Sequence, residues 1–189
     1  RGLGDVYKRQ GLNFARKIEI GNTGYSIKIE DTVNSALSED VSMTPYVVLE
    51  RDGSPVEEGG LMYTYLGPVF SSTKDTYEKY DFDDIRESSY QNKSVGGWVA
   101  LIQHYFLSAW IPDQNEEYLY QGRYGENSGR YSLGYTSRDS ILSYGETVTT
   151  KNTLYVGPKL PKQLVEIEEN LDLTVDSVSY THLTLPPVC

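Results

Sequence analysis

Two runs of alternating apolar and polar residues lie near the start of the chain, over 17–20 and 25–30. The residues between them, Gly21-Asn22-Thr23-Gly24, are types that favour turns. A period of two places successive side chains on opposite faces of a strand. The segment therefore predicts an antiparallel hairpin with one buried face.

Further short runs rich in β-branched and aromatic residues, with turn residues between them, predict additional strands. In the run over 41–50, Pro45 favours a sheet edge or a bulge because proline has no backbone N–H group. Residues 83–94 are polar and are predicted to form a connection. The other predicted strands cover 61–70, 77–82, 118–124, 131–136, 141–144 and 147–156.

The most apolar segment runs from Trp98 to Pro112, and its apolar residues occupy both odd and even positions. A strand covered on both faces has this pattern, and so does a buried helix. The aromatic and β-branched content, with Gly96-Gly97 before the segment, favours a strand. Gln103-His104 interrupts the apolar run, so we expect two strands here, with a buried helix as the alternative.

The pattern changes to a helical period at the end of the chain. Leu160, Leu164, Ile167 and Leu171 follow the spacing of one helix face, and Pro161 suits a first helical turn. The helix lacks the basic face of a membrane-surface helix, so we expect it to pack on a sheet. Many short strands followed by one short amphipathic helix predict an all-β sandwich or barrel.

Composition excludes several classes of function. The net charge is −10 and no stripe of Lys or Arg is present, which argues against a nucleic-acid partner. The single Cys, Cys189, excludes an internal disulfide, and His104 and His182 are too few for a zinc site. The 17 tyrosines suit half-buried sheet surfaces. We therefore predict no metal and no cofactor.

Several residues are candidates for chemistry, and each has a plainer structural interpretation. His104 could act as a general base, but no second imidazole or carboxylate is predicted beside it, so a structural role is favoured. The adjacent acids Asp83-Asp84 and Glu116-Glu117 are expected to be solvated rather than paired across a cleft. Trp98 and Trp110 could line a binding cleft, but large aromatic residues more often fill a core. We therefore predict no catalytic residue.

The diglycine Gly96-Gly97 does not belong to a phosphate-binding loop. No Lys-Ser or Lys-Thr pair follows it, and the GxGxxG spacing is missing. A bulge or a close approach of two backbones is the better explanation.

Four segments carry motifs of one known family, and they are Tyr77–Phe82, Gly96–Pro112, Leu154–Pro158 and Leu171–Asp176. They resemble the periplasmic domain of bacterial YidC insertases. They occur in the same order as in that family, and the resemblance covers about residues 11–176. It implies an antiparallel β-supersandwich similar to that of sugar mutarotases, with a short C-terminal helix. It also implies a place on the periplasmic side of the bacterial inner membrane and a partner, the SecD–SecF complex.

The two ends of the chain depart from this resemblance. Residues 1–10 and 177–189 match no part of the family pattern, and we hypothesise that both are foreign tails. The remaining residues resemble the later part of the periplasmic domain. We therefore expect one sheet to have an open edge and an uncovered apolar face.

Three functions are compatible with these features. The first is a non-catalytic periplasmic domain that assists insertion and folding of inner-membrane proteins, by scaffolding or by docking to the Sec machinery. The second is a mutarotase-like carbohydrate-binding module or enzyme. The third is a surface that contacts substrate chains during insertion.

Overall fold

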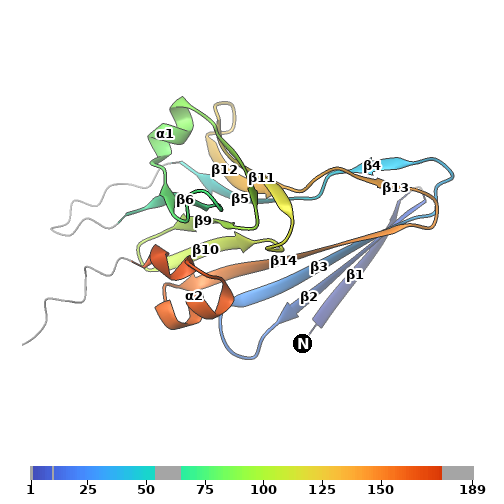
Figure 1. Cartoon of the computed structure of the whole chain (residues 1–189), viewed down its shortest axis with the longest axis horizontal. Coiled ribbons are helices and arrows are strands. Elements are labelled where there is room, and N and C mark those ends of the chain that lie inside the picture. Colours follow the sequence, from blue (N-terminus) through green and yellow to red (C-terminus); the bar gives the residue numbers. More distant parts are fainter. Residues whose placement is uncertain (1, 10, 54–64, 176–189) are drawn as a thin grey trace, which may run out of the picture.

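The computed structural model describes the backbone of residues 2–9 and the complete residues 11–53 and 65–175. Strands dominate, with two short α-helices and one 3₁₀ helix (Figure 1). Their bounds are β1 (Gly2–Arg9), β2 (Leu12–Ile20), β3 (Ser26–Ser35), β4 (Val41–Met43), β5 (Tyr46–Asp52), β6 (Gly67–Ser71), β7 (Glu78–Lys79), α1 (Phe82–Glu87), β8 (Tyr90–Val95), β9 (Trp98–Ile102), β10 (Phe106–Ile111), β11 (Glu117–Gly125), β12 (Arg130–Thr136), β13 (Ser140–Leu142), β14 (Thr147–Pro158), α2 (Pro161–Ile167) and η1 (Leu171–Thr174).

The strands form three antiparallel sheets. An eight-stranded sheet has the order β1-β2-β3-β14-β10-β9-β6-β7, and a four-stranded sheet has the order β5-β12-β11-β8. The third sheet is the two-stranded ribbon β13-β4. The predicted all-β sandwich with a short C-terminal helix is confirmed.

Strand β9 lies between two apolar cores and contributes side chains to both. Trp98 and Ile102 lie in the core beneath the C-terminal helices, together with Leu164. Val99 and Leu101 lie in the other core, which the four-stranded sheet covers. This arrangement explains why apolar residues occupy both the odd and the even positions of the segment. The prediction of two strands is confirmed, because residues 103–105 form the turn between β9 and β10.

The N-terminal hairpin is confirmed, but its predicted buried face is only partly covered, because Val33 is buried whereas Ile18 and Ile29 are half-buried. Strands β2 and β3 pair in one continuous register, with Ile20 opposite Ile27. The side chain of Ile20 is nevertheless 51% exposed. In Figure 1, β2, β3 and the first half of β14 extend beyond the four-stranded sheet. We call these three strands the arm. The segment from Met43 to Val47 faces that stretch across a groove, and the ribbon β13-β4 lies at its far end.

Pro45 divides the predicted strand over 41–50 into β4 and β5. Strand β5 is an edge of the four-stranded sheet, as proline predicted. The strand predicted over 61–70 is confirmed from Gly67 onward, where it forms β6. Residues 61–64 of the predicted strand lie outside the described part of the chain.

The strand predicted over 77–82 is confirmed only at Glu78–Lys79, and the connection predicted over 83–94 is wrong. Only β7 is extended in the first segment, and Phe82 begins α1. The backbone N–H of Asp81 donates to the Asp84 carboxylate at 3.0 Å, which closes the first turn of this helix. Phe82 and Ile85 are the buried residues of α1, a spacing that fits one helical face. The second segment also contains β8.

The predicted C-terminal helix is present but shorter than expected. Helix α2 ends at Ile167, and Asn170 follows in the left-handed backbone conformation, with φ of 66°. Leu164 and Leu171 are completely buried, so α2 and η1 pack on the sheet as predicted.

Candidate functional site

An apolar concavity lies between the arm and the segment that joins β4 to β5. We call it the arm groove. Its volume is about 600 Å³, which falls within the usual size range of ligand sites. The arm contributes to one wall the residues Phe14, Arg16, Asp31, Val33, Val148 and Asn152, and the opposite wall contains Met43, Pro45, Tyr46, Val47 and Tyr135.

The polar groups in the arm groove already bind one another. Arg16 donates two hydrogen bonds to Asp31, from Nε at 2.6 Å and from a terminal nitrogen at 2.8 Å. These hydrogen bonds raise the pKa of Arg16 above its ordinary value. The Tyr135 hydroxyl donates to Oδ1 of Asn152 at 2.7 Å. Such paired groups can orient a ligand, but none of these four side chains is left as a free acid or base.

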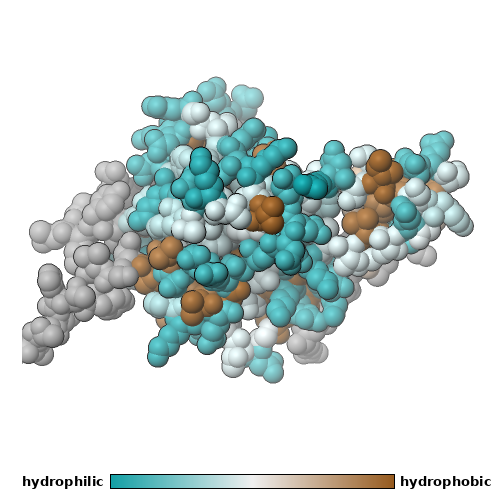
Figure 2. Space-filling model, viewed as in Figure 1, coloured by the Kyte–Doolittle hydropathy of each residue, from teal (hydrophilic) through white to brown (hydrophobic). Residues whose placement is uncertain are grey.

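Exposed apolar side chains border the same part of the molecule. Tyr46 is 72% exposed and Phe14 is 38% exposed. Ile141 in the ribbon β13-β4 is 65% exposed, and Figure 2 shows hydrophobic residues gathered over this ribbon. Gathered apolar surface of this kind is typical of interaction sites.

The expected chemical residues do not meet in the arm groove. His104 lies exposed in the β9–β10 turn, with its ring centroid 4.3 Å from that of Tyr105. It lines a separate small recess with Arg51 and Phe82.

The two tryptophans lie on opposite sides of the large sheet. Trp98 is 1% exposed within the core beneath α2, and its indole nitrogen has no hydrogen-bond partner among the described residues. Trp110 packs against the second core and donates from Nε1 to the carbonyl oxygen of Val48 at 3.3 Å. They do not form one cleft.

The adjacent acids also lie apart from the arm groove. Asp83 and Asp84 are in the first turn of α1, and Glu117 forms an ion pair with Arg138 at 3.2 Å. Within residues 11–53 and 65–175 no group of three His, Cys, Asp or Glu side chains is arranged to hold a metal ion.

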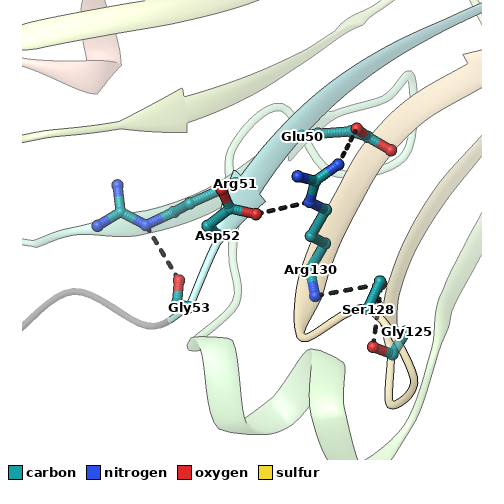
Figure 3. Close-up of polar contacts among 7 residues, drawn as sticks. All are labelled: Glu50, Arg51, Asp52, Gly53, Gly125, Ser128 and Arg130. Carbon is teal, nitrogen blue, oxygen red and sulfur yellow. Dashed lines mark hydrogen bonds and ion pairs between the residues drawn. The ribbon is translucent and has the colours of Figure 1, made fainter.

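A further polar cluster joins β12 to the edge strand β5. Arg130 reaches from β12 to Asp52 at 2.6 Å and to Glu50 at 3.8 Å (Figure 3). All three side chains are at least half exposed. Exposed ion pairs contribute little to stability, about 0–1 kcal/mol, so this cluster mainly places charge on the β5 edge.

Sequence reasoning missed the arm groove as a site. One signal was available, because the predicted hairpin places Arg16 opposite Asp31 once its register is fixed. Tyr135 and Asn152 come from distant strands, and no local pattern connects them with the hairpin.

The buried tyrosines should make the fold sensitive to alkali. Burial, with smaller contributions from Glu116 and Asp113, raises the pKa of Tyr118 to about 12. In the unfolded chain a tyrosine titrates near pH 10. The stability that this neutral phenol contributes is therefore complete below pH 10 and falls between pH 10 and 12. Tyr118→Phe should flatten the loss of stability over that interval, measured by urea unfolding at several pH values.

Tyr144→Phe is the matched control for this measurement, because Tyr144 is 74% exposed. It should leave the slope between pH 10 and 12 unchanged. An equal effect of both substitutions would contradict the assignment to burial.

Comparison with known proteins assigns the family. The family model described as "YidC periplasmic domain" matches residues 6–186. The chain belongs to the YidC periplasmic domain family. The match begins within β1 and ends beyond the last described residue, and the foreign origin of residues 1–10 and 177–189 remains a hypothesis.

Curated relatives carry the name "Membrane protein insertase YidC". The relative from Nitrosococcus oceani is 39% identical over 177 residues, which is 93% of this chain and 32% of the relative. The relative from Actinobacillus succinogenes is 34% identical over 174 residues, 90% of this chain and 32% of the relative. The chain thus spans about a third of the length of these YidC relatives. No helix among the described residues is long and apolar enough to cross a membrane.

Solved structures share the fold of this YidC-family chain at low sequence identity. An alpha-galactosidase from Lactobacillus brevis aligns with a TM-score of 0.59 and 10% identity over 82% of this chain and 22% of that protein. An alpha-galactosidase from Geobacillus stearothermophilus gives a TM-score of 0.58 and 9% identity over 82% of this chain and 24% of that protein. These similarities show the fold alone.

Proposed function

We propose that this chain is a non-catalytic periplasmic domain of a membrane protein insertase, which assists the insertion and folding of inner-membrane proteins. The observation that carries the proposal is the family match over residues 6–186, together with relatives named as insertases. The domain acts at the periplasmic face of the bacterial inner membrane. It scaffolds the insertase or docks to the Sec machinery through SecD–SecF.

The arm groove supports a role in binding rather than in catalysis. Its charged pair, Arg16 and Asp31, is satisfied internally, and the hydroxyl of Tyr135 is engaged by Asn152. A general acid or base must reach the proton that it transfers. His104 is in a different recess. A mutarotase-like carbohydrate function is the alternative, and saturable sugar binding or anomerisation of a free sugar would favour it.

A chimeric insertase tests the proposal. Residues 11–175 would replace the matching part of the Nitrosococcus oceani relative, in a strain depleted of its own insertase. We expect growth to be restored and SecD–SecF to co-purify with the chimera. A matched protein with this region deleted should insert proteins less well and lose SecD–SecF. Growth without co-purification would contradict the docking role, and an inactive but well-expressed chimera would contradict the insertase role.

A further inference from the structure

Strand β5 forms an outer edge of the four-stranded sheet, where it pairs with β12 on one side. The carbonyl oxygen of Pro45 accepts a hydrogen bond from the N–H of Ser137, on the β12 side. Backbone groups alternate in direction along an antiparallel strand. Tyr46, Val48 and Glu50 therefore direct their backbone N–H and C=O groups away from β12. These groups form an edge to which a further strand can bond.

The free side of β5 points over the arm. Strand β12 lies against β9 and β5 lies against β10, so the two sheets run in the same order. Beyond β10 the large sheet continues with β14, β3 and β2. In Figure 1 these strands extend past the four-stranded sheet. A strand added to β5 would therefore lie over β14, and further strands would lie over β3 and β2.

The face of these strands on the β5 side is apolar. Trp110 packs in the core that the four-stranded sheet covers, and it pairs with Leu154 on β14. Leu154 pairs with Ile27, and Ile27 pairs with Ile20. Leu154 and Ile27 are half-buried, whereas Ile20 at the end of this row is 51% exposed. Burial thus falls with each strand beyond β10. We call the apolar residues of this face the open floor, and they are Ile18, Ile20, Ile27, Ile29, Leu154 and Val156.

The opposite face of the same strands is polar. Its alternate positions carry Lys17, Glu19, Lys28, Glu30 and Lys151. One apolar face and one charged face are typical of a sheet that packs on a core on one side and meets water on the other. The open floor therefore has the composition of a packed face, although the described residues leave Ile20 and Val156 about half exposed.

The contacts of β5 indicate the chemistry that an added strand should have. Arg130 pairs with Glu50 and Asp52 and offsets one of their two negative charges. The remaining negative charge favours Lys or Arg in a strand beside Glu50. The Val48 carbonyl accepts from the indole of Trp110 at 3.3 Å. This hydrogen bond is longer than usual, and a backbone N–H of an added strand can replace it.

The width of the open floor indicates the source of the missing cover. Neighbouring strands of a sheet lie about 4.8 Å apart, so β14, β3 and β2 together need about 14 Å of cover. A single extended segment would cover only one of these strands and leave the others exposed. The chain spans 32% of its Actinobacillus succinogenes relative, so most of that relative lies outside the matched region. A segment of the same polypeptide also has a high effective concentration at β5.

We propose that, in the intact protein, several strands of the same polypeptide from outside residues 1–189 pair with β5 and extend the four-stranded sheet over the open floor. The first of these strands bonds to the outward backbone groups of Tyr46, Val48 and Glu50. Its side chains alternate, with apolar residues on the open floor and polar residues in water. This completion of the sheet follows from the sheet geometry and the length of the relatives, and it does not depend on the insertase role.

Hydrogen exchange at β5 tests the added strand. The chimeric insertase that carries residues 11–175 is compared with the isolated chain. We expect the amides of Tyr46, Val48 and Glu50 to exchange about a hundredfold more slowly in the chimera, because a new ladder protects them. The amides of Val47 and Leu49 should be protected in both proteins, since they face β12. Equal exchange of the three outward amides in the two proteins would overturn the proposal.

Photocrosslinking in the chimera tests the source of the added strands. A photoreactive residue replaces Ile20 on the open floor, and a control replaces Glu19, its neighbour on the opposite face. Position 20 should crosslink within one polypeptide to a segment outside the grafted residues, and position 19 should not. A crosslink from position 20 to a newly inserted protein, or to a second copy of the chimera, would overturn the assignment to the same polypeptide. Growth of the depleted strain bears on the insertase role alone.

A measurement on the isolated chain decides whether the open floor is uncovered, independently of the chimera. The neutral dye Nile red should bind the open floor and fluoresce. Ile20→Asn should lower this fluorescence about twofold, because it removes the most exposed apolar side chain of the open floor. Tyr144→Asn is the control, since Tyr144 is 74% exposed outside the open floor, and it should leave the fluorescence unchanged. Equal fluorescence of the Ile20→Asn protein and the unchanged chain would overturn the proposal.

Discussion

Replacing Gly97 with alanine is expected to lower the free energy of unfolding by about 3–6 kcal/mol, combining backbone strain with steric overlap. Gly97 has a φ of 91°, in the region that favours glycine. A Cβ atom there would overlap the carbonyl oxygen of Ser71 in the neighbouring strand β6. Gln114 holds this backbone in place by accepting from the Gly97 N–H at 2.7 Å and donating to its carbonyl at 3.1 Å. Urea unfolding monitored by circular dichroism measures the change.

Gly24→Ala is the matched control for this substitution. Gly24 has a nearly identical φ of 88°, but no atom lies within 4 Å of the position that a Cβ would take. Alanine at Gly24 should cost only the backbone strain, about 1–2 kcal/mol. Equal losses at the two positions would show that the contact with β6 is not the cause.

Trp98→Ala is expected to destabilise the fold by about 3–5 kcal/mol, since a large aromatic side chain leaves a cavity in a packed core. Trp98 is 1% exposed and shares its core with Leu164 of α2 and with Leu171 of η1. Loss of the ring should therefore loosen the C-terminal helices as well as β9. The midpoint of urea unfolding, with hydrogen exchange of α2 as a local readout, measures both effects.

Trp110→Phe provides the comparison on the other side of the sheet. It removes one hydrogen bond, from the indole to Val48, and keeps an aromatic ring, so we expect a loss of about 1 kcal/mol. A Trp98→Ala protein with unchanged stability but weakened ligand binding would instead support a binding cleft.

Local periodicity was sufficient to predict most strands and the two-faced segment at β9. Val99 and Ile102 lie on opposite faces of β9 and belong to different cores. Both faces of the strand are therefore buried, and every residue from Trp98 to Ile102 is apolar. Helix α1 was missed because it is six residues long and buries only Phe82 and Ile85. A helix this short has little periodic signal, although Asp81 and Asp84 at its start were a capping pattern.

The exposure of the arm could not be predicted from the alternation in β2 and β3. Alternation shows which side chains share a face, whereas burial of that face depends on how far a second sheet extends over it. Only β5 of the four-stranded sheet lies near the hairpin in the sequence, whereas β8, β11 and β12 come from segments much farther along the chain. The arm groove was missed for the same reason, because Arg16 and Tyr135 meet only after the sheets pack.

The eight-stranded sheet cannot be completed during synthesis until β14 has emerged, because β3 pairs with β14. Asn34 bonds to Thr147, a residue 113 positions later in the chain. At ordinary rates of translation, on the order of ten seconds separate the emergence of these two residues. Throughout that interval the β2–β3 hairpin lacks β14, the strand that joins it to the rest of the sheet, so the open edge of β3 needs protection from aggregation until β14 emerges.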